Sequence, residues 1–175
     1  MVGIVAVNRF SEAGSAVFSS YINYIDRKEA VRESNQCKFN IFSGYMDYMD
    51  NDTKTIVVQQ AQLEKMSALF TKDQQTLSAD AKAGLKQAFR TAQENGSILW
   101  QTVISFDNAY LEQVGLWDSE TRTLNEPQLR NAARKAITEM LRREHLEHAT
   151  WCGAFHYNTD NIHIHIAITE QKPMR

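Results

Sequence analysis

The hydrophobic positions of this chain follow two periods, which predict strands and helices in alternation. Strands are expected where β-branched and aromatic residues cluster or alternate; these segments are 3–7, 97–106, 151–156 and 162–168, while 54–58 fits a short strand or a helix entry. Helices are expected where apolar residues return every three to four positions; these segments are 15–32, 41–49, 76–95 and 125–148, with a short helical turn from residue 108. Helices interleaved with antiparallel-capable strands and a final hairpin indicate an α+β fold, with an antiparallel sheet and flanking helices.

End signals support several of these helices. Ser15 and Ser78 are candidate N-caps, Asn95-Gly96 is a helix stop, and Pro127 lies in a first turn, where its missing N–H costs nothing. The basic residues between 130 and 143 are diluted by glutamates, so we expect a solvated face with i,i+4 ion pairs there in preference to contact with DNA.

Composition narrows the class of protein. The chain has 175 residues, 43% hydrophobic and 23% charged, which fits one globular domain. Its N-terminal apolar run has no preceding basic region, so we interpret it as a strand rather than a signal peptide, and no apolar stretch is long enough to span a bilayer. Cys37 and Cys152 have no metal-ligand spacing and are expected to be reduced, in the cytoplasm. A net charge of −2 argues against bulk electrostatic binding of nucleic acid, although a local basic groove stays open.

The stretch HYNTDNIHIHIAI, residues 156–168, carries the main candidate chemistry. Side chains alternate faces along a strand, so the four isoleucines point to one side, and His163 and His165 to the other. Residues 158–161 are turn residues, and a four-residue loop there would pair His156 with His163. Three neutral imidazoles on one face can hold a divalent cation and leave positions open for water or substrate.

Two other interpretations of these histidines remain. They can be half-exposed strand residues without chemistry, although the third histidine in pairing register makes this less attractive. A nucleotidyl hydrolase family with a His-x-His-x-His run and a histidine nucleophile fits poorly, because Ala167 occupies the third position.

The same block resembles the three-histidine motif of HUH endonucleases, and specifically the MobP/MobL-type conjugative relaxases of Gram-positive mobile elements. The segments GIVAVNRF, YINYIDRKEAV, FSGYMDYMDN and VISFD also resemble that family, over nearly the whole chain. The resemblance implies an HUH-relaxase-like fold with its metal site on central strands. Asn158 departs from the acidic residue common in the family at that position. Family members usually continue past the histidine strand, so we expect residues 1–175 to be a single relaxase domain, truncated at its C-terminus.

The resemblance also implies an activity. A relaxase tyrosine attacks a scissile phosphodiester at a transfer origin, leaving a 5′-phosphotyrosine and a free 3′-OH for conjugative mobilisation of a plasmid. The metal ligands would be His156, His163 and His165, with Mg²⁺ or Mn²⁺ as the cofactor, or else Zn²⁺. We predict Tyr24 as the nucleophile and Tyr21 as its alternative, in preference to Tyr45 and Tyr48.

Further roles are less strongly indicated. Arg27 and Lys28 would contact DNA phosphates, although a solvated helix face explains them equally well. Asp107 fits either a partner for a ligand histidine or a helix cap, and the three tryptophans fit the core better than base stacking. The expected partners are single-stranded DNA and a type IV secretion coupling protein. The rival functions are a non-catalytic DNA-binding remnant of the same fold and a metal-dependent nucleotide phosphodiesterase.

Overall fold

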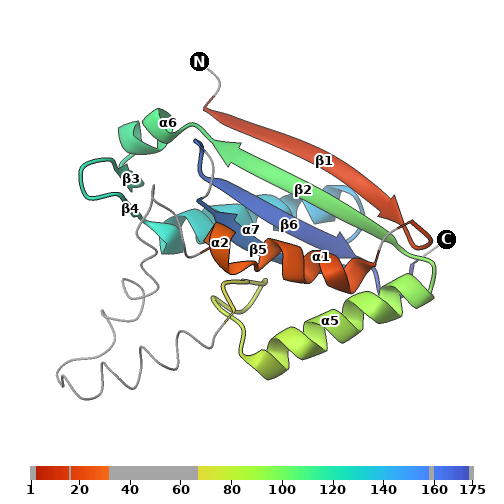
Figure 1. The fold of residues 1–175 in the computed structure, drawn as a ribbon. Coiled ribbons are helices and arrows are strands. Elements are labelled where there is room, and N and C mark those ends of the chain that lie inside the picture. The colour runs from red at the N-terminus through yellow and green to blue at the C-terminus, as the bar shows by residue number, and fades with distance from the viewer. Residues whose placement is uncertain (1–2, 16, 32–66, 158–159, 174–175) are drawn as a thin grey trace.

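The sheet is the centre of the structure. The computed structural model describes residues 3–15, 17–31, 67–157 and 160–173. Four antiparallel strands lie in the order β1-β2-β6-β5 (Figure 1). They are β1 (Ile4–Glu12), β2 (Ile98–Phe106), β5 (Thr150–His156) and β6 (His163–Thr169). The predicted α+β class with an antiparallel sheet is confirmed, and each predicted strand within the described residues is present.

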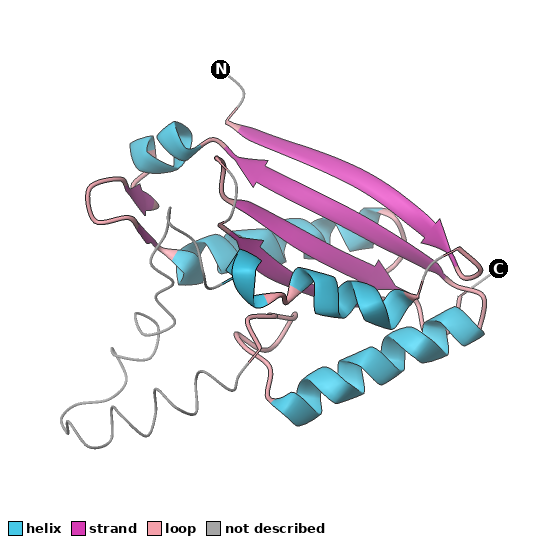
Figure 2. Cartoon of the chain, viewed as in Figure 1, coloured by secondary structure: helices cyan, strands magenta, loops and turns pink. Residues whose placement is uncertain are grey.

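Helices lie on both sides of this sheet (Figure 2). The elements other than the four strands are α1 (Phe18–Ile25), α2 (Lys28–Val31), α5 (Ala79–Glu94), α6 (Asn108–Gln113), α7 (Glu126–Arg143) and a small hairpin of β3 (Trp117–Asp118) and β4 (Thr123–Leu124). Within the described part of the chain, each helix is too short or too polar to cross a bilayer.

The isoleucine face of β6 forms one core with α7. Ile162, Ile164, Ile166 and Ile168 are all at most 2% exposed. They share a cluster with the apolar face of α7, which includes Leu129, Ala133, Ile137 and Leu141. Burial of this face under a helix is therefore as predicted, and it fixes which side of β6 carries the histidines.

The histidine face of β5 and β6 is covered as well, where an open face was expected. The side chains there are small, since Cys152, Ala154 and Ala167 are the neighbours of the histidines. Small side chains let α1 approach closely, and its Phe18, Ile22 and Ile25 complete a second core. In Figure 1, α1 lies in front of the β5–β6 side of the sheet, whereas β1 and β2 lie clear of this helix.

Several predicted element ends differ from the observed ones. The first strand continues to Glu12, and the helix expected over 15–32 is interrupted at Asp26-Arg27. Val17, not Ser15, precedes α1, because the Ser15 hydroxyl donates to the Glu12 carbonyl in a turn. α7 ends at Arg143 rather than near 148, and the hairpin of β3 and β4 was not predicted.

Other predicted ends are confirmed. Ser78 caps α5 by accepting from the amide of Ala81, and Pro127 lies in the first turn of α7. The predictions for 41–49, 54–58, Cys37, Tyr45 and Tyr48 lie outside the described residues.

The basic face predicted for α7 is solvated at Lys135 and at its C-terminal end, but not at Arg130. Arg142 and Arg143 are exposed and pair with Glu139, as expected. Arg130 is 6% exposed and pairs with the buried Glu126. The carboxylate of Glu126 also accepts a hydrogen bond from the Tyr157 hydroxyl. For Arg130 the prediction of a solvated residue is wrong, because a buried charge network ties α7 to the end of β5.

Gly153 gives a stability prediction. Phe70 forms an antiparallel bridge with Gly153, and a Cβ at this glycine would lie 2.9 Å from the buried ring of Phe70. We expect Gly153→Ala to destabilise the protein by about 1–3 kcal/mol, because a packed aromatic ring must move. In α5, Gly84 has nothing within 4 Å of a built Cβ, and Gly84→Ala should stabilise by about 0.5–1 kcal/mol. Urea unfolding of both variants checks the opposite signs; equal effects would contradict the packing argument.

Candidate metal and nucleophile site

The three predicted histidines converge on one face of the sheet. The β5–β6 register pairs His156 directly with His163, as predicted, and alternation along β6 places His165 on the same side. Their ring centroids lie 4.2 to 5.3 Å apart, and one nitrogen from each ring lies within 4.8 Å of the others. β6 is a central strand, but β5 is the outer strand of the described sheet. The expectation of a site on central strands therefore holds for His163 and His165, and not for His156.

His156 is held with one nitrogen turned into the cluster. Its side chain is fully buried, and Nε2 lies 2.8 Å from the carbonyl oxygen of Ile25. That oxygen can only accept, so Nε2 carries the proton and Nδ1 carries the lone pair. Among the described residues, this buried Nδ1 has no hydrogen-bond partner. An unsatisfied buried lone pair is costly, and a cation between the three rings would satisfy it.

The other two histidines are oriented through Nδ1. His163 Nδ1 lies 3.1 Å from the carbonyl oxygen of Asn161, and His165 Nδ1 lies 3.3 Å from the Tyr21 hydroxyl. A proton on Nδ1 puts the lone pair on Nε2, the form that a metal ligand requires. The start of β6 is fixed by Asn108, whose side chain accepts from the amide of Ile162 and donates to the carbonyl of Asp160.

All three histidines are held in the neutral form. Burial lowers the pKa of His156 to about 4 and the pKa of His165 to about 3, and it also lowers the pKa of His163. The positive charge of Arg27 opposes protonation of each ring as well. Neutral imidazoles at physiological pH are cation ligands, so the donor set fits a divalent transition metal or a similar cation.

These lowered pKa values predict a pH-dependent stability. Between pH 6.5 and about 4, unfolded chains bind protons at His156 and His165 whereas the folded chain does not. The free energy of unfolding should therefore fall as pH drops through this window, and the stabilisation is fully present above pH 6.5. Thermal unfolding in a chelator at a series of pH values checks this. A His165→Ala variant should show a shallower dependence, and an identical slope would contradict the assignment.

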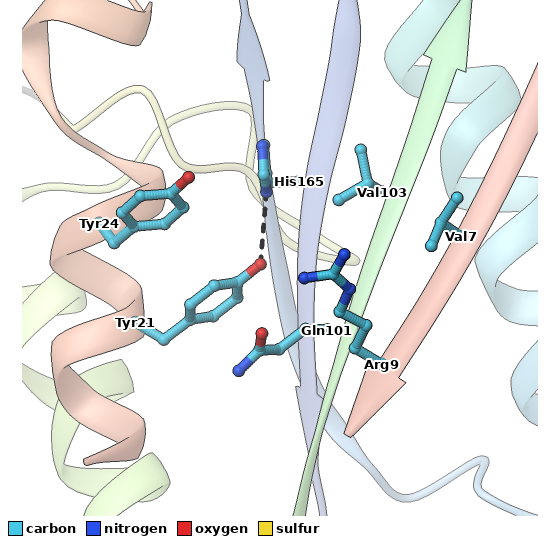
Figure 3. Close-up of a pocket in the computed structure, with 7 residues that line it drawn as sticks. All are labelled: Val7, Arg9, Tyr21, Tyr24, Gln101, Val103 and His165. Carbon is cyan, nitrogen blue, oxygen red and sulfur yellow. Dashed lines mark hydrogen bonds between the residues drawn. The ribbon is translucent and has the colours of Figure 1, made fainter. Parts of the chain in front are cut away.

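The two candidate tyrosines project from α1 onto the histidines. The rings of Tyr21 and Tyr24 are stacked, with centroids 5.7 Å apart. Tyr24 meets His165 edge-on at 5.7 Å and His156 at 6.4 Å. Figure 3 shows the hydrogen bond between the Tyr21 hydroxyl and His165, with Tyr24 on the neighbouring turn of the helix. The structure thus places both tyrosines beside the triad.

Their environments differ in a way that bears on reactivity. Tyr24 is 47% exposed. Tyr21 is more buried, and burial, followed by the nearby Tyr24, raises the pKa of its phenol. Of the two tyrosines, Tyr24 is the more accessible to a large substrate such as DNA.

Arg27 packs on Tyr24 at the site, and Lys28 is the next residue, at the start of α2. The Arg27 guanidinium is centred 4.1 Å from the Tyr24 ring and donates to the Tyr24 carbonyl at 2.8 Å. This position is close enough to affect all three histidines electrostatically. Lys28 is exposed in the first turn of α2.

Asp26 is a residue whose role sequence reasoning missed. Its carboxylate is 6% exposed and accepts from the Ser67 hydroxyl, the Ala68 amide and Lys82 Nζ, the last at 2.5 Å. These contacts fix the break between α1 and α2, directly after the Ile25 carbonyl that orients His156. The only sequence signal was a charged residue within an apolar helical pattern.

Two alternatives left open by the sequence are decided. Asp107 caps α6 by accepting from the amide of Tyr110 at 2.9 Å, so the cap is confirmed. Trp117 and Trp151 are at most 9% exposed and belong to the core with α7.

One of three comparisons with known proteins found a match, and it identifies the family. No curated protein and no solved structure matches the chain. The family model of the MobL relaxases matches residues 1–175. With the match spanning the whole chain, this protein belongs to the MobL relaxase family.

Proposed function

We propose that this protein nicks DNA site- and strand-specifically at a transfer origin, as an HUH endonuclease of mobilisable elements in Gram-positive bacteria. The observation that carries the proposal is the exposed phenol of Tyr24 beside three neutral, converging histidines. The substrate is single-stranded DNA, and passage to a recipient cell would use a type IV secretion coupling protein.

In the proposed reaction, the phenol oxygen of Tyr24 attacks the scissile phosphorus. The P–O3′ bond breaks, the phenol proton leaves to solvent or base, and the departing 3′ oxygen takes up a proton as a free hydroxyl. The product is a 5′-phosphotyrosine ester. One phosphodiester bond is therefore exchanged for another, and none is hydrolysed. A divalent cation, Mg²⁺, Mn²⁺ or Zn²⁺, bound by His156, His163 and His165 would supply Lewis-acid stabilisation of the phosphate charge.

The neighbours of Tyr24 have assisting roles. Arg27 would neutralise a non-bridging phosphate oxygen, and Lys28 would bind a phosphate further along the DNA strand. Tyr21 shares its hydrogen bond with His165 Nδ1 and supports the orientation of that ring. Its greater burial makes Tyr21 the weaker nucleophile candidate.

Covalent capture tests the proposal. The protein is mixed with a labelled library of single-stranded oligonucleotides and Mn²⁺, and any adduct is separated on a denaturing gel and mapped by mass spectrometry. An adduct on Tyr24 that forms only with the cation supports the proposal. Absence of any adduct, in protein that binds both the cation and DNA, would favour a non-catalytic DNA binder. Hydrolysis of small phosphodiesters without an adduct would favour the phosphodiesterase.

A further inference from the structure

A pocket lies beside the histidines, on the two strands that α1 leaves uncovered. It has a volume of about 500 Å³. We call it the outer-strand pocket; it is lined by Val7, Arg9, Tyr21, Tyr24, Gln101, Val103 and His165 (Figure 3). The size lies within the range of about 300–1,000 Å³ that is usual for small-ligand sites.

The strand register explains why these residues meet. Val7 pairs with Val103, and Val103 pairs with His165, so the valines continue the row that starts at a triad histidine. In the next row, Arg9 pairs with Gln101. Both rows are on the histidine face, so the pocket and the triad form one continuous surface, with the phenols of α1 between them.

The pocket has one strong cation. The Arg9 guanidinium makes no hydrogen bond or ion pair with any described residue, and its charge acts on the Tyr21 phenol. In Figure 3 its guanidinium reaches from β1 toward the Tyr21 hydroxyl. Of the described residues that line the pocket, none is acidic. An unpaired guanidinium over an apolar floor suits a phosphate attached to a flat, apolar ring.

We propose that the outer-strand pocket binds one nucleotide of the single-stranded DNA next to the scissile phosphate. Arg9 binds its phosphate, Val7 and Val103 pack against the base, and the Gln101 amide hydrogen-bonds the edge of that base. The inference rests on the proposed function. The proposal adds a basic DNA contact, Arg9 on β1, on the opposite side of the tyrosines from Arg27. The single-stranded DNA would then pass over the tyrosines between these two arginines.

Binding measurements test this pocket separately from chemistry. Wild type and Arg9→Ala are titrated with a fluorescent single-stranded oligonucleotide pool in a chelator, across a series of salt concentrations, so that no adduct can form. The matched control is Arg143→Ala, which removes the same charge from α7, where the side chain is 72% exposed. We expect Arg9→Ala to weaken binding roughly tenfold at low salt, and to reduce the slope of log K against log salt by about 0.7, the value for one phosphate contact on a single strand.

A second variant tests the pocket itself. Val103→Trp should fill the floor while keeping a residue type that strands favour. It should weaken DNA binding as much as Arg9→Ala, and Mn²⁺ titration should show the triad intact. The inference is overturned if Arg9→Ala matches Arg143→Ala in affinity and salt slope, or if Val103→Trp binds DNA like wild type. If both variants weaken binding as expected but wild type forms no adduct with Mn²⁺ in the covalent-capture experiment, the result would instead count against the proposed nicking.

Discussion

Tyr24→Phe is expected to abolish the covalent DNA adduct. The substitution removes only the attacking oxygen, since a phenylalanine ring keeps the stack on Tyr21 and the contact with Arg27. Loss of a nucleophile typically lowers turnover by several orders of magnitude, so adduct formation should fall at least about 1,000-fold. The measurement is the rate of appearance of the protein–DNA band with Mn²⁺ and a captured oligonucleotide. DNA binding in a chelator should change little.

Tyr21→Phe is the matched control, one helical turn away. It removes an oxygen that lies 3.3 Å from His165 Nδ1. We expect slower adduct formation and weaker cation binding, because His165 loses an orienting partner, but the adduct should still form on Tyr24. If Tyr21→Phe eliminated the adduct and Tyr24→Phe retained it, the assignment of the nucleophile would be reversed.

The histidine cluster could be predicted because its determinants are local. Alternation along 162–168 decides the two faces, and the predicted four-residue loop gave the expected register between the adjacent strands. A one-residue slip would move the isoleucines out of the core, so the pairing of His156 with His163 is strongly specified. The roles of Ser78 and Pro127 were predictable for the same reason, since a cap depends on neighbouring residues only.

The surroundings of the cluster could not be predicted, because they depend on contacts between distant segments. Burial of His156 requires α1 on the sheet, which in turn requires small residues such as Ala154 and Ala167 beneath it. Asp26 finds its partner Lys82 in α5. Arg9 faces the site only because β1 pairs with β2, a strand that begins 86 residues after β1 ends (98 − 12). No periodicity within one segment reveals such pairings.

The half-covered histidine face has a functional consequence. Over β5 and β6, α1 excludes water from the rings, which lowers their pKa values and keeps them neutral. Over β1 and β2, the same face is open and carries Arg9 and Gln101. Among the described residues, this open face is a side from which a charged polymer can reach the histidines, and Tyr24 lies at the boundary between the covered and open parts.

His163→Ala is expected to eliminate divalent-cation binding. The variant leaves two ligands, and His156 Nδ1 then lacks its nearest cross-strand partner. Loss of an outer partner of a metal ligand alone typically costs about 10–100-fold in affinity, so loss of a ligand should cost at least about 100-fold. Calorimetric titration with Mn²⁺ measures this, and thermal unfolding in a chelator confirms that the variant folds. His145→Asn, at an exposed histidine after α7 whose φ of 57° asparagine tolerates, controls for adventitious binding and should match wild type. Unchanged Mn²⁺ affinity in His163→Ala would show that the converging histidines are not the cation site, and the role proposed for a bound cation at Tyr24 would fall with it.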